Sequence, residues 1–306
     1  KQHPNYQWLQ DASSTGLQQS LRHLDKAYQS FFKTKQGYPR FKSKYNRQSI
    51  SFTGGQVRLV DNGILIPKLK SPIRIVQSRE LPSVPSSSTL SKDASGRYFI
   101  SFTCECDGET LPVVEKVIGV DLGLKDVVVC SDGFKSGNPK HYKCLDARLK
   151  FYQRRLAKKE KGSNNRRKAR YKVAKVYAKI KDQRLDFLHK LSRKLVNENQ
   201  GIAVENLAIK NMMRNHKLAR SIASASWGEF VRQLTYKAAW AGRTLLTLGT
   251  YVRSTGVCHC CGWESPERLK LSVREWNCGS CGTKHDRDIS AAKVIGIKAG
   301  LNPAYL

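Results

Sequence analysis

The sequence is poor in acidic residues and lacks any long apolar run. It contains 24 aspartates and glutamates against 55 lysines and arginines, a formal net charge of +31 at pH 7. No apolar stretch approaches the ~18 residues of a membrane-spanning helix, and no basic segment has the Trp, Phe and Leu face of a helix that lies on a membrane. These absences argue against a membrane partner, so nucleic acid is the favoured polyanion.

A signal-peptide pattern is also lacking. Five of the nine cysteines fall between residues 258 and 281 at the spacing of metal ligands, so we expect a reducing compartment and no disulfide framework. The chain begins with Lys1 and not with methionine, so we expect that residues of the natural protein precede it.

The N-terminal third combines a helical pattern with short strands. Residues 16–35 repeat apolar side chains at helical spacing and predict an amphipathic helix. The following GYPRFKSK interleaves Arg40, Lys42 and Lys44 with aromatic rings; this suits a phosphate backbone with stacked bases, although a surface strand with extended basic side chains looks the same. Residues 49–106 contain short alternating runs between turn residues and predict a small, barrel-like all-β unit.

Residues 150–194 are strongly basic. They hold 18 lysines and arginines against three acidic residues, while leucine, isoleucine and valine recur every three to four positions. The interruption GSNNRRK separates two predicted antiparallel helices and places Arg166, Arg167 and Lys168 at their tip. A charged face usually serves only solubility, but so large a field of one sign favours neutralisation by phosphates.

Three acidic residues stand beside apolar segments. Asp121 interrupts the apolar strand VIGVDLGLKDVVV, Glu205 ends the short strand IAVE, and Asp288 lies at the start of an apolar helix in HDRDISAAKVIGIKAG. Each has an ordinary explanation: a turn residue for Asp121, a strand end for Glu205 and a helix cap for Asp288. A buried and unpaired carboxylate would cost several kcal/mol, so Asp121 needs a cap role, an ion-pair partner or a cation.

A further helix is expected over about 226–246, before the strand LLTLGTYV. Its apolar face would carry Trp227, Phe230, Leu234, Ala238 and Leu245, and we assign the aromatic rings to the core and not to a stacking surface.

The segment CHCCGWESPERLKLSVREWNCGSC contains two Cys-x-x-Cys pairs. Cys258 and Cys261 form the first, Cys278 and Cys281 the second, with 16 residues between the pairs and a glycine after each. Four thiolates so spaced are typical of one tetrahedral zinc ion. Because four cysteines leave no open coordination position, we predict a structural zinc, with Cys260 pointing away from it.

The acidic and cysteine motifs resemble those of the TnpB (OrfB) family, transposon-encoded RNA-guided DNA endonucleases related to type V CRISPR effectors. GVDLGLKD, AVENL and HDRDISAA look like the three acidic motifs of a RuvC-type, RNase H-like nuclease, with a zinc ribbon between the second and third. GYPRFKSK, the basic hairpin and LAIKNMMRNHKLARSIASASWGEF extend the resemblance from about residue 16 over nearly the whole chain. Two departures are Ser290, where the family usually has asparagine, and the family's additional strand and helix upstream of Lys1.

The resemblance implies an α/β fold with three parts. A helical recognition segment would cover 1–46, a wedge-like β-barrel 47–115 and a RuvC-like nuclease domain 116–306. The last would contain the basic hairpin at about 142–200 and the zinc ribbon at about 254–284.

The resemblance also implies chemistry and partners. Asp121, Glu205 and Asp288 would hold two catalytic Mg²⁺ ions, with Asp121 bridging both, beside the one structural Zn²⁺. The partners would be a guide RNA from the transposon end and a double-stranded DNA target with a short adjacent motif, and no membrane. A monomer in the prokaryotic cytoplasm, associated with the nucleoid, is expected.

Two other functions stay open. A nuclease-silent, RNA-guided DNA-binding repressor would need no acidic triad, and the three retained acids argue against it. A guide-free zinc-ribbon DNA-binding accessory of transposition would explain the charge and the cysteines, but it leaves Glu205 and Asp288 without a role.

Overall fold

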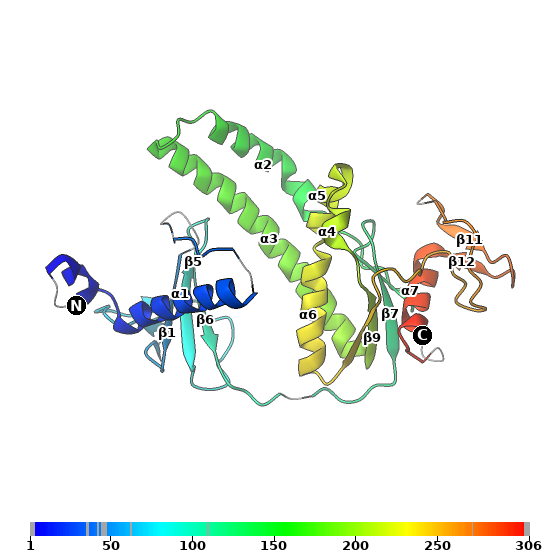
Figure 1. Ribbon diagram of the computed structural model, residues 1–306, viewed down its shortest axis with the longest axis horizontal. Coiled ribbons are helices and arrows are strands. Elements are labelled where there is room, and N and C mark those ends of the chain that lie inside the picture. Colours follow the sequence, from blue (N-terminus) through cyan, green and yellow to red (C-terminus); the bar gives the residue numbers. More distant parts are fainter. Residues whose placement is uncertain are drawn as a thin grey trace. The chain divides into compact units, whose positions relative to one another are not determined.

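The computed structural model describes residues 4–34, 37–41, 43, 48–61, 63–108, 110–270 and 272–302 (Figure 1). It divides into two compact units. Unit 1 comprises Lys1–Asp107 and Lys159–Lys175, and unit 2 comprises Gly108–Lys158 and Val176–Leu306. The predicted division into domains 1–46, 47–115 and 116–306 stays a prediction.

Unit 1 begins with the 3₁₀ helix η1 (Pro4–Gln10) and the helix α1 (Ser14–Thr34). The predicted helix over 16–35 is therefore present. Gly16 anchors α1 on the first strand: a Cβ atom added there would lie 2.7 Å from Cδ1 of Ile50. Further along, the ring of Phe31 packs edge to face on that of Tyr38, with 5.4 Å between the centroids.

Two three-stranded antiparallel sheets complete unit 1. The first has the order β1 (Gln48–Thr53), β5 (Ser87–Lys92), β6 (Tyr98–Thr103), and the second the order β2 (Arg58–Val60), β3 (Gly63–Leu65), β4 (Ile73–Arg74). Both sheets contribute to one small core, formed by Phe52, Val57, Ile64 and Ile66. The strands fall where the alternating runs predict them, and closure into a barrel stays a prediction.

Unit 2 is built on one four-stranded sheet. Its order is β10 (Thr244–Leu248), β9 (Gly201–Glu205), β7 (Val117–Leu122), β8 (Val128–Cys130). β9 is parallel to both β7 and β10, whereas β8 is antiparallel to β7. Asp121 and Glu205 consequently lie at the carboxyl ends of neighbouring parallel strands.

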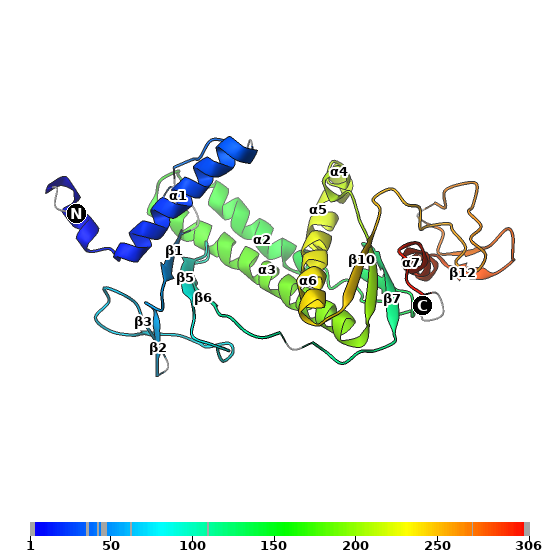
Figure 2. The ribbon, with the colours of Figure 1, turned by 60° about the horizontal axis from the view of Figure 1, so that its bottom comes forward.

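Helices cover both faces of this sheet (Figure 2). One face packs on the end of α3 (Asn164–Glu198), on α5 (His216–Ala225) and on α6 (Trp227–Trp240), and its core includes the fully buried Phe230, Leu234 and Leu195. The other face packs on α7 (Arg287–Lys298). α2 (His141–Ala157) precedes α3 as the predicted basic hairpin, and the short α4 (Ile209–Met212) precedes α5.

The helix predicted over 226–246 is wrong at its end. α6 stops at Trp240, and Gly242 then adopts a φ of +66°, a left-handed conformation that favours glycine and terminates the helix. Leu245 belongs to β10 and not to the helix face. Trp227 and Phe230 are in the core as predicted. Among the described residues, no helix has the length and apolar character needed to cross a membrane.

Contact between α7 and β7 depends on Gly119. A Cβ atom at this position would lie 1.9 Å from the carbonyl oxygen of Ala292, so any side chain must push the helix away from the strand. Asp121 lies two residues further along the same strand. The close approach therefore sets how near the start of α7 comes to the end of β7.

Gly119→Ala should lower the free energy of unfolding by about 3 kcal/mol or more, because the backbone of α7 cannot yield as a flexible side chain would. Gly228→Ala is the matched control: its Cβ would lie 3.7 Å from Cδ1 of Ile209 in the first turn of α6, and a change between neutral and about 1 kcal/mol of stabilisation is expected. Denaturant unfolding followed by circular dichroism measures both. Equal stability of the two variants would contradict the close packing.

Candidate metal centres

Asp121 and Glu205 lie side by side. Val120 pairs with Val204 in the register of β7 and β9, so the residues that follow them are neighbours. The backbone amide of Leu122 donates a hydrogen bond of 3.0 Å to Oε1 of Glu205, and the carboxyl group of Glu205 is close enough to act on the pKa of Asp121. The topology of the sheet thus pairs two acids that are 84 residues apart in the chain.

Burial and like charge both disfavour ionisation of this pair. Burial, followed by repulsion from Glu205 and Asp288, raises the pKa of Asp121 well above its usual range, against the opposing charge of Arg287. Burial also raises the pKa of Glu205, although the hydrogen bond from Leu122 acts in the opposite direction. Two such carboxyls need a shared proton or a cation between them.

Asp288 reaches the same region from α7, but not as its cap. The N-cap is Asp286, whose carboxylate accepts hydrogen bonds from the backbone amides of Asp288 (3.0 Å) and Ile289 (3.1 Å). The capping explanation for Asp288 is therefore wrong, and its carboxylate is released for another role. Sequence reasoning overlooked Asp286; the two aspartates in HDRD were the signal that only one of them could be the cap.

The carboxylate of Asp288 is paired with a cation of the neighbouring loop. Nη1 of Arg274 donates to Oδ2 of Asp288 at 3.3 Å, and the arginine side chain is 53% exposed. Among the described residues, only the four cysteines form a group of three or more His, Cys, Asp or Glu ligands close enough to hold one ion. The structure therefore brings Asp121 and Glu205 together and places Asp288 near them, but it does not draw the three acids into a cluster as tight as that of the thiols.

The acidic residues fit a hard cation by their chemistry. Mg²⁺ prefers carboxylate oxygen and keeps several water ligands, so it does not need every carboxylate in direct contact. Two adjacent, partly buried carboxyl groups beside a third carboxylate provide the donor set that such an ion requires.

Ser290 faces away from the acids. Its side chain is buried, and its hydroxyl donates to the carbonyl of Val257 at 3.3 Å and lies 3.2 Å from Nδ1 of His259. Both partners adjoin Cys258. In this chain, the residue at the usual asparagine position links α7 to the cysteine segment.

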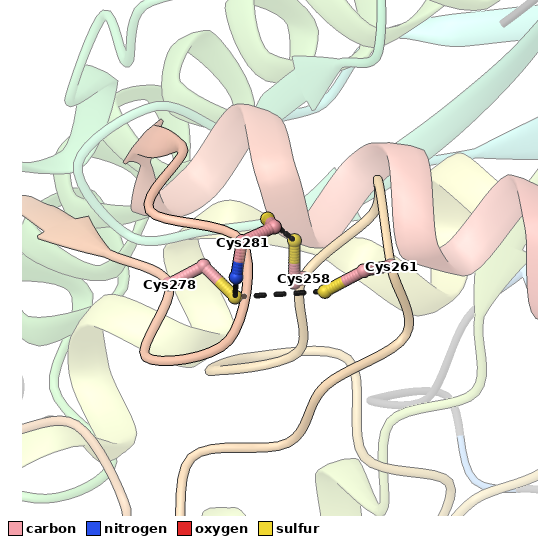
Figure 3. Close-up of side chains that lie close together, drawn as sticks. All are labelled: Cys258, Cys261, Cys278 and Cys281. Atoms are coloured by element: carbon pink, nitrogen blue, oxygen red, sulfur yellow. Dashed lines mark hydrogen bonds between the residues drawn. The ribbon is translucent and has the colours of Figure 1, made fainter.

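The four predicted zinc ligands converge (Figure 3). The Sγ atoms of Cys258 and Cys281 are 3.6 Å apart, as are those of Cys261 and Cys278, and all four lie within 4.8 Å of one another. A tetrahedron with Zn–S distances of about 2.3 Å has edges of about 3.8 Å, so the cluster fits zinc. Cys260 is exposed and outside the cluster, as predicted.

Two equivalent turns hold the cysteines. Gly262 has a φ of +76° and donates from its amide to the carbonyl of Cys258 at 3.0 Å; Gly282 has a φ of +71° and makes the same 3.0 Å bond to Cys278. β11 (Glu275–Asn277) and β12 (Lys284–Asp286) form the antiparallel pair around the second turn.

The environments of the thiols differ. Burial raises the pKa of the Cys258 thiol to about 12, whereas hydrogen bonds with Thr283 lower the pKa of Cys281 to about 6. His285, which sequence reasoning overlooked, is buried with Nε2 3.1 Å from Sγ of Cys258. A cation that replaces the thiol protons is the common solution for such a cluster.

The predicted nucleic-acid ligands that the structure describes all belong to unit 1. Arg40, Arg167 and Lys168 are exposed. Arg166 is half-buried and donates from Nη1 to the carbonyl of Lys159 at 2.7 Å, so it also closes the tip of the hairpin. Lys42 and Lys44 lie outside the described residues.

Comparison with known proteins assigns the family. Residues 101–216 match the family model OrfB_IS605, described as "Probable transposase", and residues 227–295 match the Cas12f1-like TNB domain. A protein of Streptomyces pristinaespiralis named "Putative RNA-guided DNA endonuclease" is 43% identical over 297 residues, 96% of this chain and 73% of the relative. The chain belongs to the TnpB (OrfB) family.

Other relatives agree with this family. "Putative RNA-guided DNA endonuclease InsQ" of Escherichia coli strain K12 is 30% identical over 94% of this chain and 75% of the relative. A TnpB-like protein of Acanthamoeba polyphaga mimivirus is 27% identical over 79% of this chain and 47% of the relative. The solved structure of a Cas12f1–sgRNA–target DNA complex aligns with a TM-score of 0.54 at 12% identity, covering 92% of this chain and 70% of the Cas12f1 chain, which indicates a shared fold.

The expected membership of the TnpB family is thereby confirmed, together with a mixed α/β fold like that of Cas12f1. The RNase H-like character of the sheet, the barrel and the roles of individual residues stay predictions.

Cys278→Ser should abolish zinc binding in this TnpB chain, because three thiolates and a weakly acidic hydroxyl do not complete the tetrahedral site. Cys260→Ser should keep about one zinc per chain, since this thiol lies outside the cluster. Elemental analysis of the purified proteins gives the zinc content, and thermal melting with a chelator gives its effect on stability. Zinc retained by Cys278→Ser, or lost from Cys260→Ser, would contradict the ligand set.

Without added Mg²⁺, Asp121→Asn should raise the melting temperature, because it removes one of two adjacent, partly buried carboxyl groups. Mg²⁺ should stabilise the native chain, by about 1.4 kcal/mol at ten times its Kd, and should not stabilise the variant. Asp132→Asn, which changes an exposed acid after β8, is the matched control and should respond to Mg²⁺ as the native chain does. The same response of all three proteins would remove Asp121 from the metal site.

Proposed function

We propose that this chain is an RNA-guided DNA endonuclease that hydrolyses target DNA at a two-magnesium, RuvC-like site. The observation that carries the proposal is the pairing of Asp121 and Glu205 at adjacent parallel strand ends, with Asp288 nearby on α7. An RNase H-like sheet brings carboxylates together in this way. Family membership supports the same assignment, because the three acidic motifs resemble those of the family.

Asp121, Glu205 and Asp288 would be the magnesium ligands, with Asp121 shared between the two ions by family resemblance. Bound magnesium supplies an acidified water nucleophile and stabilises the leaving 3′ oxygen of the scissile phosphodiester. The chain's own contribution is positional: the hydrogen bond from Leu122 orients Glu205, and Gly119 allows α7 to carry Asp288 close to β7. Arg274 would have to release the carboxylate of Asp288 for this residue to serve as a magnesium ligand.

Guide RNA and target DNA would neutralise the net charge of +31. The guide reads the target by base pairing, and the protein checks a short adjacent motif in the duplex. The basic hairpin, with Arg167 and Lys168 exposed at its tip, would contact the heteroduplex or the guide scaffold. α1 and the segment with Arg40 would border the adjacent-motif duplex, and the four-cysteine ribbon would be a structural zinc site.

A nuclease-silent RNA-guided DNA binder is the second candidate. The pairing of Asp288 with Arg274 favours it, because a carboxylate already neutralised by a guanidinium is a poorer ligand for a cation. Such a protein would bind guide and target, and block transcription, without cutting.

The deciding experiment is purification of the chain with bound RNA, sequencing of that RNA, and a cleavage assay on matching plasmid DNA with Mg²⁺. The native chain should cut, and Asp121→Ala should cut at least about 100-fold more slowly because the shared ligand is lost, while retaining RNA. Asp132→Ala is the matched control and should cut at the native rate. Undiminished cutting by Asp121→Ala defeats the assigned site; bound RNA without cutting by the native chain supports the silent binder.

A further inference from the structure

The outer face of α6 carries a cation and two aromatic rings at four-residue intervals: Arg232, Tyr236 and Trp240. The guanidinium of Arg232 lies 5.7 Å from the centroid of the Tyr236 ring. The rings of Tyr236 and Trp240 meet edge to face with 4.8 Å between their centroids. We call these three residues the α6 ladder. The opposite face of α6 supplies Phe230 and Leu234 to the core, so the fold of unit 2 does not require the ladder.

The ladder is held in place before any ligand binds. Glu229 accepts two hydrogen bonds from Arg232, at 2.7 and 2.8 Å, and a third from Nε2 of Gln233 at 3.0 Å. The guanidinium of Arg232 lowers the pKa of Glu229 to about 2, so this carboxylate stays charged and keeps the arginine over the tyrosine ring. A preorganised surface loses less side-chain entropy when a partner binds.

Trp240 ends the ladder with its side chain in solvent. It is 70% exposed, whereas Trp227 of the same helix is 2% exposed. Trp240 and Tyr236 together offer ring surface at the end of a rigid helix. Nucleobases stack on such surfaces irrespective of sequence.

Two cations without acidic partners adjoin the ladder: Lys237 precedes Trp240 by three residues on α6, which makes them neighbours on the helix surface, and the charge of Arg193 acts on Lys237. The ammonium group of Lys237 donates to the carbonyl of His189 at 2.8 Å and to the hydroxyl of Ser192 at 2.7 Å, and burial and the charge of Arg193 lower its pKa to about 8. Neither Lys237 nor Arg193 takes part in an ion pair within the described residues. An anion here would relieve the repulsion between the two cations.

We propose that the α6 ladder, with Arg193 and Lys237, is a binding site for single-stranded nucleic acid, in which an unpaired base stacks on Trp240 and the backbone phosphates are attracted by the two cations. Aromatic rings flanked by uncompensated cations match the two parts of a nucleotide. An apolar protein helix would instead require a groove of aliphatic side chains. The inference rests on the proposed nucleic-acid function but not on cleavage.

The test uses the full chain with its copurified RNA and two variants of Trp240. Trp240→Leu keeps an apolar side chain but removes the ring, and Trp240→Phe keeps a ring. Binding of a fluorescent oligo(dT) is followed by anisotropy, and retention of the RNA by elution with increasing salt. Loss of one stacked base should weaken binding roughly 5- to 150-fold for Trp240→Leu, while Trp240→Phe should stay close to the native chain.

The two readouts distinguish the source of the strand. Weaker oligo(dT) binding by Trp240→Leu identifies a DNA strand as the ligand, and earlier elution of the RNA identifies the guide. Arg193→Gln should lower the salt slope of the affected interaction by roughly 0.7, the value for one phosphate of a single strand. Native behaviour of Trp240→Leu in both readouts overturns the proposal, as does equal weakening by Trp240→Leu and Trp240→Phe.

Failure of this inference is distinguishable from failure of the proposed function. Cleavage is tested by Asp121→Ala, a residue of β7, and strand binding by Trp240, at the far end of α6 from Trp227. If the chain binds oligo(dT) through Trp240 but does not cut plasmid DNA, the α6 ladder is supported as a binding site and the proposed cleavage is contradicted.

Discussion

Repulsion between two carboxyl groups is the constraint on which the site in unit 2 depends. Parallel pairing of β7 and β9 forces Asp121 and Glu205 together, and partial burial of both side chains weakens their screening by water. A sequence selected only for stability would place an apolar or amide side chain at one of these positions, because an uncompensated buried charge costs several kcal/mol. A bound divalent cation would remove this cost.

The cysteine ribbon affects the same site, although the zinc that it would hold has no role in the proposed chemistry. Ser290 of α7 contacts His259 and the carbonyl of Val257, and Arg287 donates to the carbonyl of Lys270 at 3.2 Å. These contacts fix the first turn of α7, which carries Asp288. A ribbon that loses its zinc would therefore loosen the third acid as well as its own fold. In this way a structural metal in the ribbon would act on Asp288, a proposed magnesium ligand, through hydrogen bonds and not through charge.

Sequence reasoning predicted the features that depend on local periodicity or fixed spacing. α1 and the α2–α3 hairpin follow from apolar residues at helical intervals, and the cysteine cluster follows from two Cys-x-x-Cys pairs. The end of α6 was missed because Leu245 continues the helical spacing, while the conformation of Gly242 that stops the helix has no periodic signal. The pairing of Asp288 with Arg274 and the contact of Ser290 with His259 are tertiary, between residues 14 and 31 positions apart, so local sequence patterns do not reveal them.

The strength of the Arg274–Asp288 ion pair bears on the choice between the two proposed functions. The arginine side chain is 53% exposed and that of the aspartate 25%, at an N–O distance of 3.3 Å with a single hydrogen bond. Exposed pairs of this kind contribute about 0–1 kcal/mol. Ionising Asp121 and Glu205 without a cation costs more than this ion pair contributes, since burial raises the pKa values of both carboxyl groups. Release of Asp288 by Arg274 would therefore cost little if Asp121, Glu205 and Asp288 held a divalent ion together, which favours cleavage over silent binding.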